Sequence, residues 1–154
     1  MANKIPDEVY EKILEYSVIS AVDGIIFHNG KVLLAKRTQE PCKGEWWIPG
    51  GKQNKNELPE DAVKRKIKNE IGIDVKVEKM IGVYDVMFDK TAFPNVKTGV
   101  HYVARVYVVT PVNLEIKLDS TQKEYRWINR VEEGLHDYVK TALRDSKVFE
   151  NLSQ

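Results

Sequence analysis

The segment GGKQNKNELPEDAVKRKIKNEIGI, residues 50–73, joins a paired-glycine turn to an amphipathic helix. The two glycines, Gly50 and Gly51, leave main-chain atoms open to close approach by a ligand or an ion. The apolar spacing predicts a helix over 59–71, and Gly72 follows at the usual position of a left-handed helix cap. A helix that follows such a turn presents its N-terminal dipole and one polar face to a ligand.

The two faces of this expected helix differ in chemistry. The apolar positions that anchor it to a core are Val63, Ile67 and Ile71. Positions 66, 69 and 70 fall within an arc of roughly 100° when residues turn by 100° each, so these side chains should converge on one site. An ordinary surface helix would explain the apolar stripe. It would not explain the paired glycines together with the fixed acidic spacing.

The rest of the chain alternates between strand and helix patterns. Helices are expected at 6–16, 59–71 and 131–144, and strands at 17–27, 31–37, 46–48, 74–79, 81–88, 100–110 and 123–128. Asn29-Gly30 predicts a tight hairpin, because these residues readily adopt positive φ angles. Strands mixed with a few separated helices predict an α/β-layered (α+β) fold. Without repeats or linker-like stretches, residues 1–154 are expected to form one domain.

Composition excludes several classes of function. The chain has 154 residues, 42% hydrophobic and 31% charged, with a formal net charge of +1. This charge gives no general attraction to nucleic acid or to an anionic membrane, so neither is expected as a partner. No stretch approaches the ~20 apolar residues of a membrane span, and the N-terminus does not resemble a signal peptide. Cys42 is the only cysteine. A free thiol and a cytoplasmic location are therefore expected.

The segment quoted above resembles the signature of the Nudix hydrolases. That signature is a glycine, five residues, Glu, seven residues, and then Arg-Glu-apolar-x-Glu-Glu-x-Gly-apolar. The matching positions are Gly51, Glu57, Arg65, Ile67, Glu70, Gly72 and Ile73. The resemblance implies a Nudix fold, in which a mixed β-sheet is sandwiched between α-helices. It also implies hydrolysis of a nucleotide-derived substrate with a divalent cation.

Two departures from the signature change the expected chemistry. Lys66 and Asn69 stand where most family members carry glutamates. A three-carboxylate site would carry a charge of −3, whereas Lys66, Asn69 and Glu70 together carry none. Because hard divalent cations need anionic oxygen ligands, one ion is expected here in place of two or three. Mg²⁺ suits such ligands, and Mn²⁺ would also suit them.

This chain resembles one branch of the family, the GDP-mannose mannosyl hydrolases, which also lack these two glutamates. Other segments resembling that branch are LLAKRTQEPCKGEWWIPGGK, GVYDV, VHYVARV and EYRWIN. The resemblance implies that water displaces a nucleoside diphosphate at the anomeric carbon of a sugar. A nucleotide-sugar substrate, GDP-mannose in that branch, and a homodimer follow as expectations. A single Mg²⁺ with a few cationic side chains is enough to neutralise the departing diphosphate.

The resemblance also implies roles for individual residues. Gly50, through its carbonyl, and Glu70 would bind the metal; Arg37, Lys52 and Arg65 would contact phosphates or stabilise the leaving group; Asp23 and Tyr102 would contact the sugar or nucleotide. Each has an ordinary alternative. Arg65 alone would brace Glu57, and Asp23 would simply end a strand. Arg37 and Lys52 would be solvated charges, and Tyr102 would be a packing residue.

The loop KLDSTQKE, residues 117–124, lacks the histidine that serves as general base in that branch. With a one-residue gap in the match, Gln122 is the expected metal ligand; without the gap, Thr121 takes that position. Glu124 is the nearest carboxylate and becomes the candidate base, because neutral Gln cannot accept a proton. Lys123 would need a strongly lowered pKa. His28, His101 and His136 are each expected to be surface or packing residues.

Two further functions stay open from the sequence. One is a pyrophosphohydrolase that cleaves between phosphates, with metal ligands drawn from Glu57, Glu70 and acids of the loop. The other is a nucleotide-binding module without catalysis, to which Lys66, Asn69 and the absent histidine would also be suited.

Overall fold

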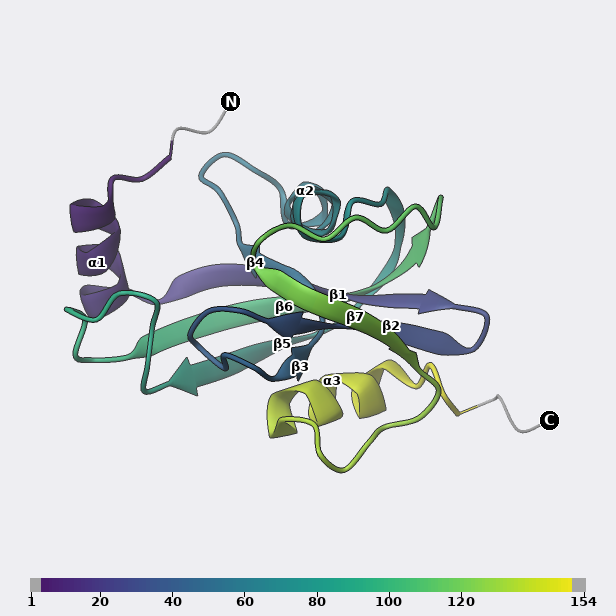
Figure 1. Ribbon diagram of the computed structural model, residues 1–154. Helices are drawn as coiled ribbons and strands as arrows, with labels where there is room; N and C mark the ends of the chain where they lie inside the picture. Colours follow the sequence, from purple (N-terminus) through teal and green to yellow (C-terminus); the bar gives the residue numbers. More distant parts are fainter. Residues whose placement is uncertain (1–3, 151–154) are drawn as a thin grey trace.

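A computed structural model describes residues 4–150, which form a seven-stranded sheet and three helices (Figure 1). The helices are α1 (Asp7–Tyr16), α2 (Pro59–Ile71) and α3 (Asp137–Ser146). The strands are β1 (Ile19–His28), β2 (Lys31–Arg37), β3 (Trp46–Trp47), β4 (Gly50–Lys52), β5 (Val75–Phe88), β6 (Val100–Pro111) and β7 (Gln122–Ile128). No helix in the described part of the chain is long and apolar enough to cross a membrane.

The sheet is mixed. Its main path runs β3-β2-β1-β6-β5, while β4 pairs with β1 and β7 pairs with β2. Strands β1 and β6 are parallel, and the other pairs are antiparallel. The short strand β4 pairs with Ala21 to Asp23 of β1. This pairing carries the paired glycines into the middle of the sheet.

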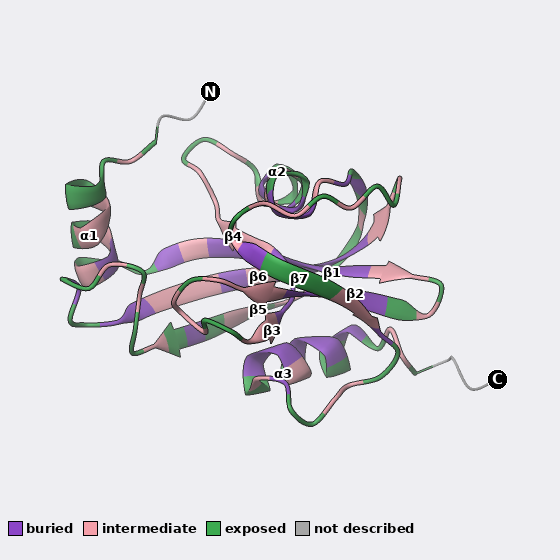
Figure 2. Cartoon of the chain, in the orientation of Figure 1, coloured by how far each residue is buried: buried purple, intermediate pink, exposed green. Residues whose placement is uncertain are grey.

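Helices α2 and α3 cover opposite faces of the sheet, and α1 lies at one end (Figure 1). Both α2 and α3 carry buried residues, coloured purple along the ribbon (Figure 2). The expected stripe of α2 is fully buried, with Val63, Ile67 and Ile71 each at 0% exposure. This burial fixes the rotation of α2 about its axis, so the polar face of the helix points away from the core beneath it. The expected fold, a mixed sheet sandwiched between helices, is confirmed.

The period-2 alternation of a strand decides which face each β1 residue meets. Val22 and Ile26 pack in the cluster under α2, whereas Ala21 and Ile25 pack in the cluster under α3. Asp23 belongs to the second set. Its carboxylate therefore points to the α3 side of the sheet, where it is 8% exposed.

Several expected elements differ from the structure at their ends. The last helix begins at Asp137, not at residue 131, because the His136 side chain caps it by accepting a hydrogen bond from the Tyr138 amide. The strands expected at 74–79 and 81–88 are one strand, β5, with two register shifts against β6. The hairpin turn has positive φ at both Asn29 and Gly30, as predicted.

Candidate active site

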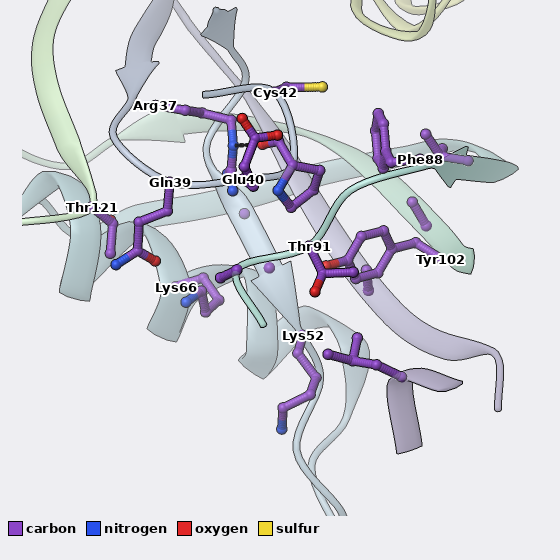
Figure 3. Close-up of a pocket in the computed structure, with 18 of the residues that line it drawn as sticks. Arg37, Gln39, Glu40, Cys42, Lys52, Lys66, Phe88, Thr91, Tyr102 and Thr121 are labelled. Atoms are coloured by element: carbon purple, nitrogen blue, oxygen red, sulfur yellow. Dashed lines mark hydrogen bonds between the residues drawn. The ribbon is translucent and has the colours of Figure 1, made fainter. Parts of the chain in front are cut away.

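A cavity of about 700 Å³ lies where β1, β4, α1 and α2 meet. Its lining includes residues far apart in the sequence, from Lys4 ahead of α1 to Tyr138 of α3. Figure 3 shows Lys66 and Thr121 on one side of this pocket and the aromatic rings of Tyr102 and Phe88 on the other. The cavity therefore has a charged part and an aromatic part.

One end of the charged part is built on the polar face of α2. Lys66 and Glu70 lie one turn apart, with 3.5 Å between Nζ and Oε2. The Thr121 hydroxyl lies 3.3 Å from the same Glu70 oxygen and 2.5 Å from Oδ1 of Asp119, so two carboxylates compete for its single proton. The other carboxylate oxygen, Oε1, is buried and has no hydrogen-bond partner among the described residues. Burial raises the pKa of Glu70, and the neighbouring Lys66 charge lowers it.

Asp23 forms the second buried acid of the cavity. The Tyr138 hydroxyl donates to Oδ2 at 2.5 Å, across 115 positions of sequence. Oδ1 lies against Gly50, because a Cβ on that glycine would overlap it. Burial raises the pKa of Asp23 to about 7, although the Tyr138 hydrogen bond lowers it. This carboxyl therefore changes its protonation near neutral pH.

Side-chain cations complete the charged part. Arg37 and Lys52 both line the cavity, and their predicted contact with phosphates stays a prediction. A register shift between Ala35 and Arg37 interrupts the pairing of β2 with β7, and such irregularities re-aim side chains. Arg37 Nε donates to the Pro41 carbonyl at 2.7 Å, which anchors the guanidinium. Burial lowers the pKa of Lys52, and the charges of Arg65 and Lys66 lower it further.

Arg65 does not line the cavity. Its guanidinium binds both carboxylate oxygens of Glu57, at 2.7 and 3.0 Å, and donates to the Lys52 carbonyl at 3.0 Å. These bonds tie the loop after β4 to α2. Nε and Nη2 of Arg65 therefore brace the loop that carries Lys52, as the ordinary alternative expected, and a contact of Arg65 with phosphates stays a prediction.

Glu124 is also outside the cavity, so the structure does not support it as the base. It is exposed on β7, where its carboxylate lies 3.7 Å from Lys36 Nζ.

Gln122 is 6% exposed and pairs with Arg37 in the sheet, but it too does not line the cavity. Thr121 lines the cavity instead. It is the residue that takes the metal-ligand position when the loop is matched to the mannosyl hydrolases without a gap. Asn69 is exposed and does not join Lys66 and Glu70.

None of the three histidines lines the cavity. His136 caps α3, and His101 is 2.7 Å from Asp85. Tyr102 does line it, and burial raises the pKa of its hydroxyl. Two cavity residues have no sequence signal that would have found them: Tyr138, distant along the chain, and Tyr10, on a helix ahead of the motif.

The donors present fit one divalent cation and not a cluster. Residues 4–150 contain no group of three or more His, Cys, Asp or Glu side chains placed to hold a metal. Among the described residues, Oε1 of Glu70 is the one buried carboxylate oxygen without a hydrogen-bond partner, and a bound cation would neutralise it. Gly50 also lines the cavity, and its carbonyl is the second expected ligand. A hard cation there would complete its coordination with ligand oxygens and water.

Comparison with known proteins places this geometry in a family. A model of the NUDIX domain matches residues 19–151. "Low-salt glycan biosynthesis protein Agl8" of Haloferax volcanii is 34% identical over 140 residues, which cover 91% of this chain and 89% of that protein. "ADP-ribose pyrophosphatase" of Methanocaldococcus jannaschii is 34% identical over 131 residues, covering 85% and 70%.

Solved structures agree. A MutT NUDIX hydrolase from Burkholderia pseudomallei superposes with a TM-score of 0.69 at 26% identity, covering 84% of this chain and 98% of that one. A MutT protein from Methanosarcina mazei Go1 has a TM-score of 0.69 at 25% identity, covering 92% and 99%. Nudix hydrolases generally use divalent metal ions such as Mg²⁺. On the matched domain and these relatives, the chain belongs to the Nudix hydrolase family.

Proposed function

We propose that this Nudix hydrolase cleaves a nucleotide sugar at the anomeric carbon, with GDP-mannose as the first substrate to test. The observation that carries the proposal is the composition of the charged part of the cavity. The Glu70 carboxylate, suited to a single cation, lies with Arg37, Lys52 and Lys66, three of the four cationic side chains that line the cavity. Such a site neutralises a departing diphosphate better than it binds the metal cluster needed to activate water at phosphorus.

In this reaction the water oxygen forms a bond to the anomeric carbon. The bond from that carbon to the diphosphate oxygen breaks, and its electron pair leaves with the nucleoside diphosphate. Mg²⁺, held by Glu70 and the Gly50 carbonyl, would supply positive charge to the leaving group. Arg37 and Lys52 would bind the phosphate oxygens, and Tyr102 would contact the sugar or nucleotide.

We assign the proton-accepting role to Asp23 in place of Glu124. Asp23 lies in the cavity with one oxygen held by Tyr138, whereas Glu124 is exposed outside it. A general base must lie within reach of the proton that it removes, and it works best with a pKa near the operating pH. Asp23 lines the cavity that the substrate would enter, and burial raises its pKa to about 7.

The related proteins support two different reactions. The name of Agl8 places that relative in glycan biosynthesis, where nucleotide sugars are ordinary substrates. The name of the second relative, ADP-ribose pyrophosphatase, favours cleavage between phosphates as the alternative. Glu70, together with Glu57 and loop acids, would have to hold the metals for that reaction. Glu57 is already bound by Arg65, which disfavours it.

Turnover of GDP-mannose with Mg²⁺ in ¹⁸O-labelled water tests the proposal. Label on the free sugar supports attack at carbon, and label on a phosphate supports the pyrophosphohydrolase. If GDP-mannose is not cleaved, the same measurement is repeated with other nucleotide sugars. Binding without turnover across that panel would indicate a nucleotide-binding module.

The homodimer implied by the resemblance is part of the same proposal. Size-exclusion chromatography with light scattering checks it, since a monomer of 17.7 kDa and a dimer are readily separated. The cytoplasmic location stays a prediction that fractionation of the source cells would test.

A further inference from the structure

Lys66 stands at a position where a carboxylate is usual, and its ammonium reaches into the cavity. It lies 3.5 Å from Oε2 of Glu70, and its side chain is 23% exposed. Within residues 4–150, Glu70 is the one group that binds this ammonium. Since an ammonium has three N–H donors, two remain free to bind a ligand that enters the cavity.

The turn before α2 makes room for this lysine. A Cβ on Gly51 would overlap Cε of Lys66, so the absence of a side chain at Gly51 lets the lysine stem cross the turn. Figure 3 shows Lys66 directed toward the pocket from the α2 side, with Lys52 below it. The missing side chain at Gly51 therefore leaves space for the Lys66 side chain as well as for a ligand.

Glu70 is divided between two cationic positions. Its Oε2 pairs with Lys66 and lies 3.3 Å from the Thr121 hydroxyl, whereas its Oε1 is buried and has no partner among the described residues. One oxygen is thus neutralised by the protein, and the other is left for one ion. Lys66 is one of four cationic side chains that line the cavity, with Arg37, Lys52 and Lys4.

We propose that the Lys66 ammonium is a built-in cation that binds the ligand diphosphate directly, in place of a second divalent ion. This inference rests on the proposed function, in which the ligand carries a diphosphate. It follows that the diphosphate binds to this protein even when no metal is present. In a site with three carboxylates, binding of the same group would need metal ions to offset the repulsion between like charges.

Calorimetric titration of the whole protein with inorganic pyrophosphate in EDTA tests this inference. Wild-type protein should bind, and Lys66→Ala should weaken binding by at least about tenfold, since charge-assisted hydrogen bonds are lost. Lys66→Arg should retain most of the affinity. Lys64→Ala is the matched control on the exposed face of the same helix, and its affinity should stay within about twofold of wild type. Circular dichroism would verify that each variant is folded.

A second variant reverses the charge. Lys66→Glu should abolish metal-free pyrophosphate binding and increase the affinity for Mn²⁺, measured by electron paramagnetic resonance without substrate. The inference is overturned if wild-type protein binds pyrophosphate only with a divalent ion, or if Lys66→Ala binds as well as wild type. Failure of the proposed function looks different: pyrophosphate would bind in EDTA, but no nucleotide sugar would be cleaved.

Discussion

Two ion pairs begin at adjacent residues of α2 and serve opposite purposes. Arg65 binds Glu57 through two hydrogen bonds of 2.7 and 3.0 Å, and a third bond reaches a backbone carbonyl. Lys66 meets Glu70 through one contact of 3.5 Å, and Oε1 of that carboxylate has no partner among residues 4–150. One pair lies outside the cavity and the other lines it.

The two pairs differ in whether the hydrogen-bonding groups of the carboxylate are satisfied, and this difference distinguishes a structural residue from a site residue. A bidentate arginine–carboxylate pair satisfies both partners and holds a loop in place. A buried carboxylate with an unsatisfied oxygen is costly unless a ligand or an ion completes it. We therefore expect Glu57 to support the structure and Glu70 to contribute to function. The following changes test that division.

The largest effect is expected from Asp23, a buried acid that shares the environment of Glu70. Asp23→Asn should lower kcat by about 10³-fold, because a neutral amide does not accept the proton. The wild-type rate should rise with pH around a midpoint of about 7, where this carboxyl ionises. The variant should lose that dependence. A pH profile of kcat/KM decides the matter, and an unchanged midpoint in Asp23→Asn would refute the assignment.

The same substitution tests the sign of the stability effect. Because the pKa of Asp23 is higher in the folded protein than in the unfolded chain, the carboxyl holds its proton more tightly when folded. The free energy of unfolding should therefore decrease as pH rises from about 4 through about 7. Asp23→Asn should lack this decrease when urea denaturation is measured at pH 5 and pH 8.

Glu70→Gln should lower Mg²⁺-dependent turnover by about 10²-fold, because the charge that attracts the ion is removed. Stability should change by less than about 1 kcal/mol, since removing a buried charge offsets the loss of its pairing with Lys66. Steady-state kinetics and urea denaturation measure the two effects. Full activity in this variant would reject the proposed metal position.

Glu57→Gln should show the reverse pattern, with a loss of about 2 kcal/mol of stability and a smaller loss of turnover. The Arg65 hydrogen bonds hold the pKa of Glu57 below its ordinary value. The stability difference from wild type should therefore be present at neutral pH and shrink as acid protonates Glu57. Glu60→Gln, exposed on the first turn of α2, is the control. Equal stability of both variants would contradict the bracing role.

The paired glycines should respond unequally to alanine. Gly50→Ala would overlap the Val22 carbonyl and the Asp23 side chain and should cost about 2 kcal/mol or more. Gly51→Ala meets only the flexible end of Lys66, so its cost, about 1 kcal/mol, should come mainly from placing an alanine at a φ of 159°. Thermal unfolding compares the two variants. Similar melting temperatures would show that β4 yields more readily than its packing indicates.

The smallest effect is expected at Glu124. Glu124→Gln should leave turnover within about twofold of wild type and stability within about 0.5 kcal/mol, because an exposed ion pair with Lys36 contributes little. A rate loss of tenfold or more would restore Glu124 as the candidate base and displace Asp23.

The local sequence was sufficient to predict the bounds of the elements that carry the motif. Helix α2 has the predicted bounds, Gly72 caps it with a φ of 85°, and the apolar stripe is buried. The hairpin at Asn29-Gly30 and strand β2 also agree with prediction. These features depend on residues a few positions apart, where periodicity and backbone preference act directly. The start of α3 was wrong, because a side-chain cap determined it.

The departures from the motif, Lys66 and Asn69, were likewise readable from the chain. The charge of the site was not, because Asn69 is exposed outside the cavity and the buried acid Asp23 lines it. Which groups share the cavity was decided by tertiary structure alone. The Asp23–Tyr138 bond joins residues 115 positions apart, and strand pairing places Thr121 at Glu70 while Glu124 faces solvent. Such contacts depend on the register of β2 with β7 and on how α3 packs, and no local pattern encodes either one.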